Sequence, residues 1–199
     1  MSTITAAQVK ELRERTGAGM MDCKRALSDT DGDMEKAIEE LRARGIAAAG
    51  KRAGRETKEG QVVAYIHPGG RIGVLLEVGC ETDFVARTDD FQNLCREIAM
   101  QVAATEAMAV ERDSLDPEFL ATEHRIFMAQ AAESGKPEAV LTRIVEGKIE
   151  KRMKEVVLLE QSSIRDPDKT VQDLVNEAIG RIGENIVVRR FARFRLGES

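Results

Sequence analysis

Few side chains in this sequence have the types and spacing that covalent chemistry needs. Cys80 follows His67 closely enough that a thiol nucleophile with an imidazole base is conceivable. However, Cys80 ends an apolar run, and cysteines in such settings are usually inert. A cysteine-dependent enzyme using Cys80 remains an alternative. We expect a protein that works by binding and is not an enzyme, because no other catalytic pattern is present.

Two short patterns resemble ion-binding loops without completing them. Asp29, Asp31 and Asp33 alternate as calcium ligands do, but a glycine stands at the fourth position, where a calcium loop requires it at the sixth. A turn that caps a helix explains them better. Residues 17–19 lack the lysine and hydroxyl residue that end a phosphate-binding loop. The sequence predicts no metal site and no cofactor.

The most informative stretch is Thr82-Asp83-Phe84-Val85-Ala86-Arg87. It follows an apolar run, 72–78, and precedes a helical pattern, which predicts a strand-to-helix loop. Such loops often carry function on a rigid scaffold. Phe84 has two interpretations: a staple that folds back onto the first helical turn, or an exposed wedge that enters a partner's pocket beside Asp83. The residues themselves leave both open.

Composition limits the class of protein. Of 199 residues, 42% are hydrophobic and 33% are charged, and no apolar run approaches the length of a membrane span. Residues 1–5 have no feature of a secretory signal, so we expect a cytoplasmic protein. The cysteines form no CxxC pair, which fits a reducing compartment. A net charge of −5 argues against non-specific binding to membranes or nucleic acids.

Helical spacing predicts three short helices in residues 1–46, and Thr5 is a candidate N-cap for the first. Met20 and Met21 open the second helix. Only one of two neighbouring side chains can point fully inward, so we expect one methionine to be exposed. Gly45 is expected to stop the third helix. Together these helices would form a small bundle with little core.

The remaining chain divides into a linker and a larger domain. Residues 47–59 carry alanines, glycines and basic side chains and are expected to be a linker, although alanine also favours a helix that persists to Ala53. Residues 60–199 combine strand patterns with helical ones. The strand patterns cover 61–67, 71–78 and 186–196. The first and last strands should share one antiparallel sheet, so the predicted fold class is α+β.

The last strand pattern, 186–196, places its apolar residues on one face and Arg189, Arg193 and Arg195 on the other. With the basic linker, these arginines raise a further alternative, an RNA-binding accessory protein. The chain is acidic as a whole, so we expect a solvated sheet face and no direct nucleic-acid binding.

Two runs of residues together resemble the signature regions of bacterial elongation factor Ts. One runs from Leu12 to Lys24 and continues with Ala26 and Leu27; the other runs from Thr82 to Arg87. Both are long and correctly spaced, and the resemblance covers nearly the whole chain. The chain ends directly after its last strand pattern, so it is similar to the short form with one core unit.

The resemblance implies a guanine-nucleotide exchange factor for the translational GTPase elongation factor Tu. In this family a bundle similar to a ubiquitin-associated domain docks on the GTPase domain of Tu. The matching positions here are Leu12, Arg13, Met20 and Met21. The short form also implies a homodimer whose contact involves the core sheet.

The second signature region implies the exchange loop itself. The family's loop pushes against Tu near the magnesium site, and it corresponds to Thr82, Asp83, Phe84 and Val85. By this resemblance, Phe84 wedges between Tu side chains, while Asp83 helps to rearrange the elements that hold Mg²⁺ and the phosphates.

Overall fold

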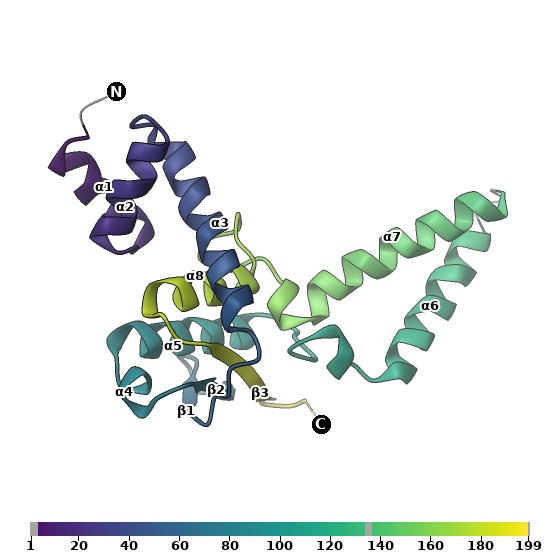
Figure 1. Cartoon of the computed structure of the whole chain (residues 1–199). Helices are drawn as coiled ribbons and strands as arrows, with labels where there is room; N and C mark the ends of the chain where they lie inside the picture. The colour runs from purple at the N-terminus through teal and green to yellow at the C-terminus, as the bar shows by residue number, and fades with distance from the viewer. Residues whose placement is uncertain (1–3, 134–136, 199) are drawn as a thin grey trace. The chain divides into compact units, whose positions relative to one another are not determined.

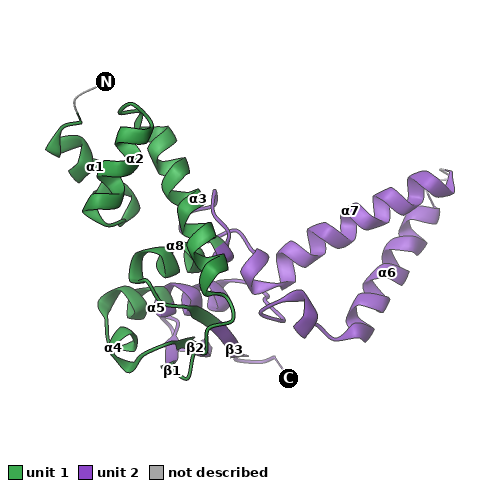
Figure 2. Cartoon of the chain, in the orientation of Figure 1, with its two compact units in different colours: residues 1–61, 78–94, 173–187 green, residues 62–77, 95–172, 188–199 purple. Residues whose placement is uncertain are grey.

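The computed structural model describes residues 4–133 and 137–198. The chain forms two compact units that interleave along the sequence (Figures 1 and 2). The first unit comprises the chain up to Gln61 together with 78–94 and 173–187, and the second comprises 62–77, 95–172 and 188–199. The architecture is mixed α+β, as predicted.

Three helices form the N-terminal bundle: α1 (Ala6–Thr16), α2 (Met20–Asp29) and α3 (Met34–Arg52). Thr5 caps α1 through a capping box with Gln8, as its residue type predicts. Gly17 ends α1 with a positive φ of 66°, a conformation that glycine adopts without strain. Asp33 caps α3 by accepting the Lys36 N–H, so the aspartate-rich turn has a capping role.

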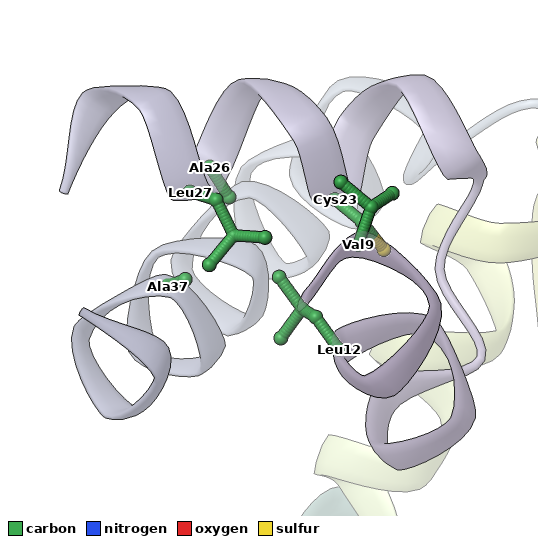
Figure 3. Packing of buried hydrophobic residues seen from close by; sticks show 6 residues of the cluster. All are labelled: Val9, Leu12, Cys23, Ala26, Leu27 and Ala37. Carbon is green, nitrogen blue, oxygen red and sulfur yellow. The ribbon is translucent and has the colours of Figure 1, made fainter. Parts of the chain in front are cut away.

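The bundle core is small, as Figure 3 shows. Its buried members are Val9, Leu12, Cys23, Ala26, Leu27 and Ala37. Leucine side chains from two helices meet at the centre, while the alanines allow the helices to approach closely. A core of this size gives limited stability, so each of its larger side chains matters to the fold.

The third helix does not stop at Gly45, so that prediction is wrong. Helix α3 continues to Arg52, which is the alternative that the alanines allowed. Gly45 lies in a close helix contact: a Cβ added at Gly180 would lie 3.2 Å from the Gly45 Cα. A glycine ends a helix when it turns left-handed, and Gly45 has no positive φ. The division at 46 and 59 stays a prediction.

The sheet has three strands, β1 (Glu59–Ile66), β2 (Ile72–Cys80) and β3 (Ile186–Arg195), in the order β1-β2-β3. It is small and antiparallel. The Leu196 N–H donates to the Arg71 carbonyl at 2.9 Å, which continues the pairing beyond the end of β3. The prediction that the first and last strands share one sheet is therefore confirmed.

The predicted faces of the last strand need a correction. The Arg193 side chain is only 16% exposed and pairs with Glu198 at 3.1 Å, whereas Phe194 is 66% exposed. Ala192 and Phe194, on the predicted apolar face, are therefore exposed in the second half of β3. Side chains alternate with a period of two, so Phe194 shares its side of the strand with the exposed Arg190.

Helices make up the rest of the chain: α4 (Asp83–Ala86), α5 (Asp89–Ala104), α6 (Pro117–Ala132), α7 (Glu138–Val156) and α8 (Val171–Ile182). Short 3-10 helices lie at Arg112–Ser114 and Leu158–Glu160. In the second unit α6 and α7 form an antiparallel hairpin (Figure 1), in which the Arg152 guanidinium lies over the Phe119 ring and the Lys148 ammonium over the Phe127 ring.

Candidate functional site: the loop that carries Phe84

The loop after β2 folds into one short capped helix, α4. The Thr82 hydroxyl accepts the Val85 N–H at 3.3 Å, which satisfies a donor that the helix start would leave unpaired. The Gln61 side-chain amide donates to the Ala86 carbonyl at 2.8 Å and holds the other end. The loop therefore has a defined shape, determined by hydrogen bonds at both ends.

Phe84 points away from the protein. Its side chain is 76% exposed, and no large apolar side chain in the described residues is more exposed. The next two residues, Val85 and Ala86, are buried and fix α4 to the protein. A staple would bury the ring against the first helical turn, so the exposure rules that interpretation out. The prediction that Phe84 is exposed in the free protein is confirmed.

Asp83 lies beside Phe84 at the start of α4 and pairs with Arg87 at 2.9 Å. Both side chains are mostly exposed. Ion pairs between exposed side chains contribute little, typically about 0.2–1 kcal/mol. A partner could therefore replace Arg87 as the neighbour of Asp83 at low cost.

A glutamate from the connection between α8 and β3 supports the loop. The Glu184 carboxylate accepts the Glu81 and Thr82 N–H groups at 3.1 and 3.0 Å, and the Thr82 hydroxyl at 2.7 Å. No sequence pattern indicates this role. Glu184 and Thr82 are 102 positions apart, and no spacing rule relates residues that meet only through the tertiary fold.

The four bundle residues of the first signature region differ in burial. Leu12 is fully buried in the core that Figure 3 shows, whereas Arg13 is exposed. Met20 and Met21 are 57% and 67% exposed. The expectation that at least one of the two is exposed is met by both, because the buried residues of α2 begin with Cys23, after both methionines.

Cys80 lacks the properties of a nucleophile. Burial, with a smaller effect from the Glu184 carboxylate, raises the pKa of its thiol to about 11, so the thiol stays protonated near neutral pH. The Cys80 thiol donates to the Thr82 carbonyl at 3.1 Å. The His67 imidazole instead lies 3.1 Å from the Tyr65 hydroxyl.

Within residues 4–133 and 137–198, no group of three or more acidic, histidine or cysteine side chains is arranged to hold a metal ion.

The second unit exposes an apolar surface on its strands, which we call the apolar sheet face. Its members are Val62, Ile66, Leu75, Phe194 and Leu196, all large hydrophobic residues exposed to solvent. Their common side follows from cross-strand contacts. Glu77 pairs with Arg190 at 2.7 Å, and the Ile66 side chain lies over Gly73. In the part of the chain that the structure describes, no helix is long and apolar enough to cross a bilayer.

The fold and site define a small α+β protein with an N-terminal three-helix bundle and an aromatic side chain presented on a capped loop. The family model for Elongation factor TS matches residues 6–198. The chain therefore belongs to the elongation factor Ts family, which makes it an elongation factor of protein biosynthesis.

Similar proteins cover almost the whole chain. Elongation factor Ts of Thermoanaerobacter sp. is 61% identical over 98% of this chain and 96% of its own length. The protein of the same name from Heliobacterium modesticaldum is 60% identical over 98% of this chain and 91% of its own length. That of Desulforamulus reducens is 57% identical over all of this chain and 92% of its own length.

Proposed function

We propose that this chain is a guanine-nucleotide exchange factor for elongation factor Tu, acting in the cytoplasm by protein binding. Family membership supports the partner, and the loop supports the mechanism. The observation that carries the proposal is the 76% exposure of Phe84 on a loop that is hydrogen-bonded at both ends. A large apolar side chain held in water on a fixed support is suited to burial in a partner.

The exchange step needs no covalent chemistry. Burying a phenylalanine side chain in a partner is favourable by about 1.5–3 kcal/mol. If the receiving pocket is open only in a Tu conformation with disturbed Mg²⁺ and phosphate contacts, this free energy favours the conformation that releases GDP. Asp83 lies next to the ring, where its carboxylate would repel the phosphates and the anionic oxygen ligands of Mg²⁺. Thr82 and Val85 keep α4 in place.

The N-terminal bundle would provide the affinity. We propose that this bundle, which resembles a ubiquitin-associated domain, docks on the GTPase domain of Tu through Met20, Met21 and Arg13. Methionine is flexible and polarizable and is common at adaptable binding surfaces. Leu12 would act indirectly, because it is fully buried and shapes the surface from below.

The apolar sheet face would bind a second copy of the chain. Phe194 and Leu196 are exposed beside Leu75 on a sheet of only three strands. An uncovered apolar surface of this kind favours association. Arg190 and Glu77, which pair at 2.7 Å on the same side, would lie at its edge. The face-to-face packing of two such sheets would form a homodimer.

Release of fluorescent GDP from elongation factor Tu tests the function. An excess of unlabelled GDP is mixed with labelled Tu·GDP, with and without this protein. We expect the protein to accelerate release, and an unchanged rate would refute the proposed function. Thermodynamic coupling provides a second measurement: GDP should weaken binding of the protein to Tu by the same factor by which the protein weakens binding of GDP.

The two alternatives make different predictions. An enzyme using Cys80 should lose its activity in the Cys80→Ser variant, whereas exchange should survive that change. An RNA-binding protein should bind RNA with an affinity that falls steeply as salt increases. The protonated state of the Cys80 thiol near neutral pH supports exchange over the first alternative.

A further inference from the structure

The segment between α8 and β3 is fixed on both sides of Glu184. The Gly183 carbonyl accepts the Arg52 Nε–H at 2.9 Å, and the Asn185 side chain donates to the Arg55 carbonyl at 2.9 Å. The Asn185 N–H also donates to the Glu81 carboxylate at 2.6 Å. Glu184 therefore projects from a backbone that is held in place, which limits the positions its carboxylate can take.

The hydrogen bonds between the two segments are reciprocal. Glu184 accepts from the backbone of Glu81 and Thr82, while the side chain of Glu81 accepts from the backbone of Asn185. Each segment thus supplies a carboxylate to the backbone N–H groups of the other. Hydrogen bonds of this charge-assisted kind are roughly twice as strong as neutral ones.

The Thr82 hydroxyl connects the Glu184 carboxylate to α4. It donates to the Glu184 carboxylate at 2.7 Å, so its lone pairs remain for the Val85 N–H at 3.3 Å. A hydroxyl has one proton, and the acceptor of that proton determines how the oxygen is oriented as a cap. Because Phe84 is exposed, its placement follows from that of α4, which this cap fixes together with the buried Val85 and the Gln61 hydrogen bond.

We propose that Glu184 is a positioning residue for exchange: its carboxylate fixes Thr82 and thereby holds Phe84 and Asp83 in the orientation that acts on the partner GTPase. The proposal rests on the proposed function and adds to it a residue from outside both signature regions. Glu184 itself need not touch the partner. Its effect is expected on the step that loosens the nucleotide, and much less on docking.

The test uses the full chain with Glu184→Gln. Glutamine has nearly the same shape, and its one oxygen can still accept the two backbone N–H groups. Its amide nitrogen cannot accept, so the Thr82 hydroxyl proton loses its charged acceptor and the hydroxyl must reorient. We expect the rate constant of GDP release from Tu at saturating factor to fall about tenfold. The concentration for half-maximal stimulation should change less than about twofold, because the docking surface is intact.

A double-mutant cycle with Phe84→Ala separates positioning from general structural damage. If Glu184 acts through the loop, Glu184→Gln should have a clearly smaller effect once the ring is gone, because only its effect through Asp83 remains. Glu150→Gln is the matched control. This substitution removes the same charge from a carboxylate that pairs with Arg112 at 2.7 Å. With this variant, GDP release from Tu should proceed at the wild-type rate.

The outcomes are distinguishable. If the wild-type protein does not accelerate GDP release, the proposed function fails first. If the wild type accelerates release and Glu184→Gln does so equally well, the positioning role is wrong. The role is also wrong if Glu184→Gln lowers the rate by the same factor with and without Phe84. The role is supported if Glu184→Gln lowers the rate, if this effect is smaller in the Phe84→Ala background, and if Glu150→Gln leaves the rate unchanged.

Discussion

Phe84 and Val85 are adjacent on α4 and lie in opposite environments, one 76% and the other 6% exposed. The buried residue fixes the short helix to the protein, and the exposed one is presented to solvent. Val85 therefore contributes to stability, and Phe84 is left free for the proposed contact with the partner. The two effects can be measured independently.

Substitution of each residue by alanine should separate the two effects. Val85→Ala removes buried methyl groups and should lower the free energy of unfolding by about 2 kcal/mol. Phe84→Ala removes a side chain that packs little and should change the free energy of unfolding by less than about 0.5 kcal/mol. Urea denaturation followed by circular dichroism measures both. A large loss of stability in Phe84→Ala would contradict the exposed placement of the ring.

The bundle residues should likewise differ in whether their substitution affects binding or stability. Met20→Ala combined with Met21→Ala should leave the melting temperature unchanged but weaken binding to elongation factor Tu about tenfold, because both side chains are exposed on the proposed docking surface. Isothermal titration calorimetry measures the affinity. Met128→Ala, at a partly exposed methionine on α6, is the control and should bind normally.

Leu12→Ala should act through the fold. Leu12 is fully buried in a core of six residues, and its truncation should cost about 3 kcal/mol. That is a large fraction of what such a small core supplies, so we expect loss of helical signal on mild heating. A variant as stable as the wild type would contradict the buried, structural role of Leu12.

The apolar sheet face should control the oligomeric state. Phe194→Asp places a charge where two sheets would pack, and burial of an unpaired charge is strongly unfavourable. Sedimentation velocity should therefore show a dimer for the wild type and a monomer for this variant. Met108→Asp introduces the same charge at an exposed position outside the apolar sheet face and should remain dimeric. A wild-type monomer at micromolar concentration would exclude the dimer.

Cys80 should make the stability depend on alkaline pH. The pKa of its thiol is raised from 9.0 to about 11 in the folded protein. The neutral thiol therefore contributes to the free energy of unfolding, and the ionised thiol does not. This contribution is fully present below pH 9.0 and is lost as the pH rises through about 11. The stability difference between wild type and Cys80→Ser should therefore shrink across this interval. A difference that is constant from pH 8 to 11 would contradict the raised pKa.

Local patterns predicted the elements well, because caps and periodicity depend on neighbouring residues. Thr5 and Asp33 cap helices as their residue types indicate, and the strand patterns at both ends share one sheet. Gly45 was misleading because a glycine also permits close approach of α8, which only the tertiary fold reveals. The site was predictable in part. Spacing could not decide the exposure of Phe84, and Glu184 meets the loop across 102 positions.

The most direct test of the exchange mechanism compares wild type with Phe84→Ala at saturating concentration of each, with release of fluorescent GDP from elongation factor Tu as the readout. We expect the wild type to accelerate release on the order of 100-fold, the upper part of the range for coupled sites. The Phe84→Ala variant should still bind Tu. GDP release from Tu should be about tenfold slower with this variant than with the wild type. Equal rates from the two proteins would contradict the role of Phe84 as the wedge.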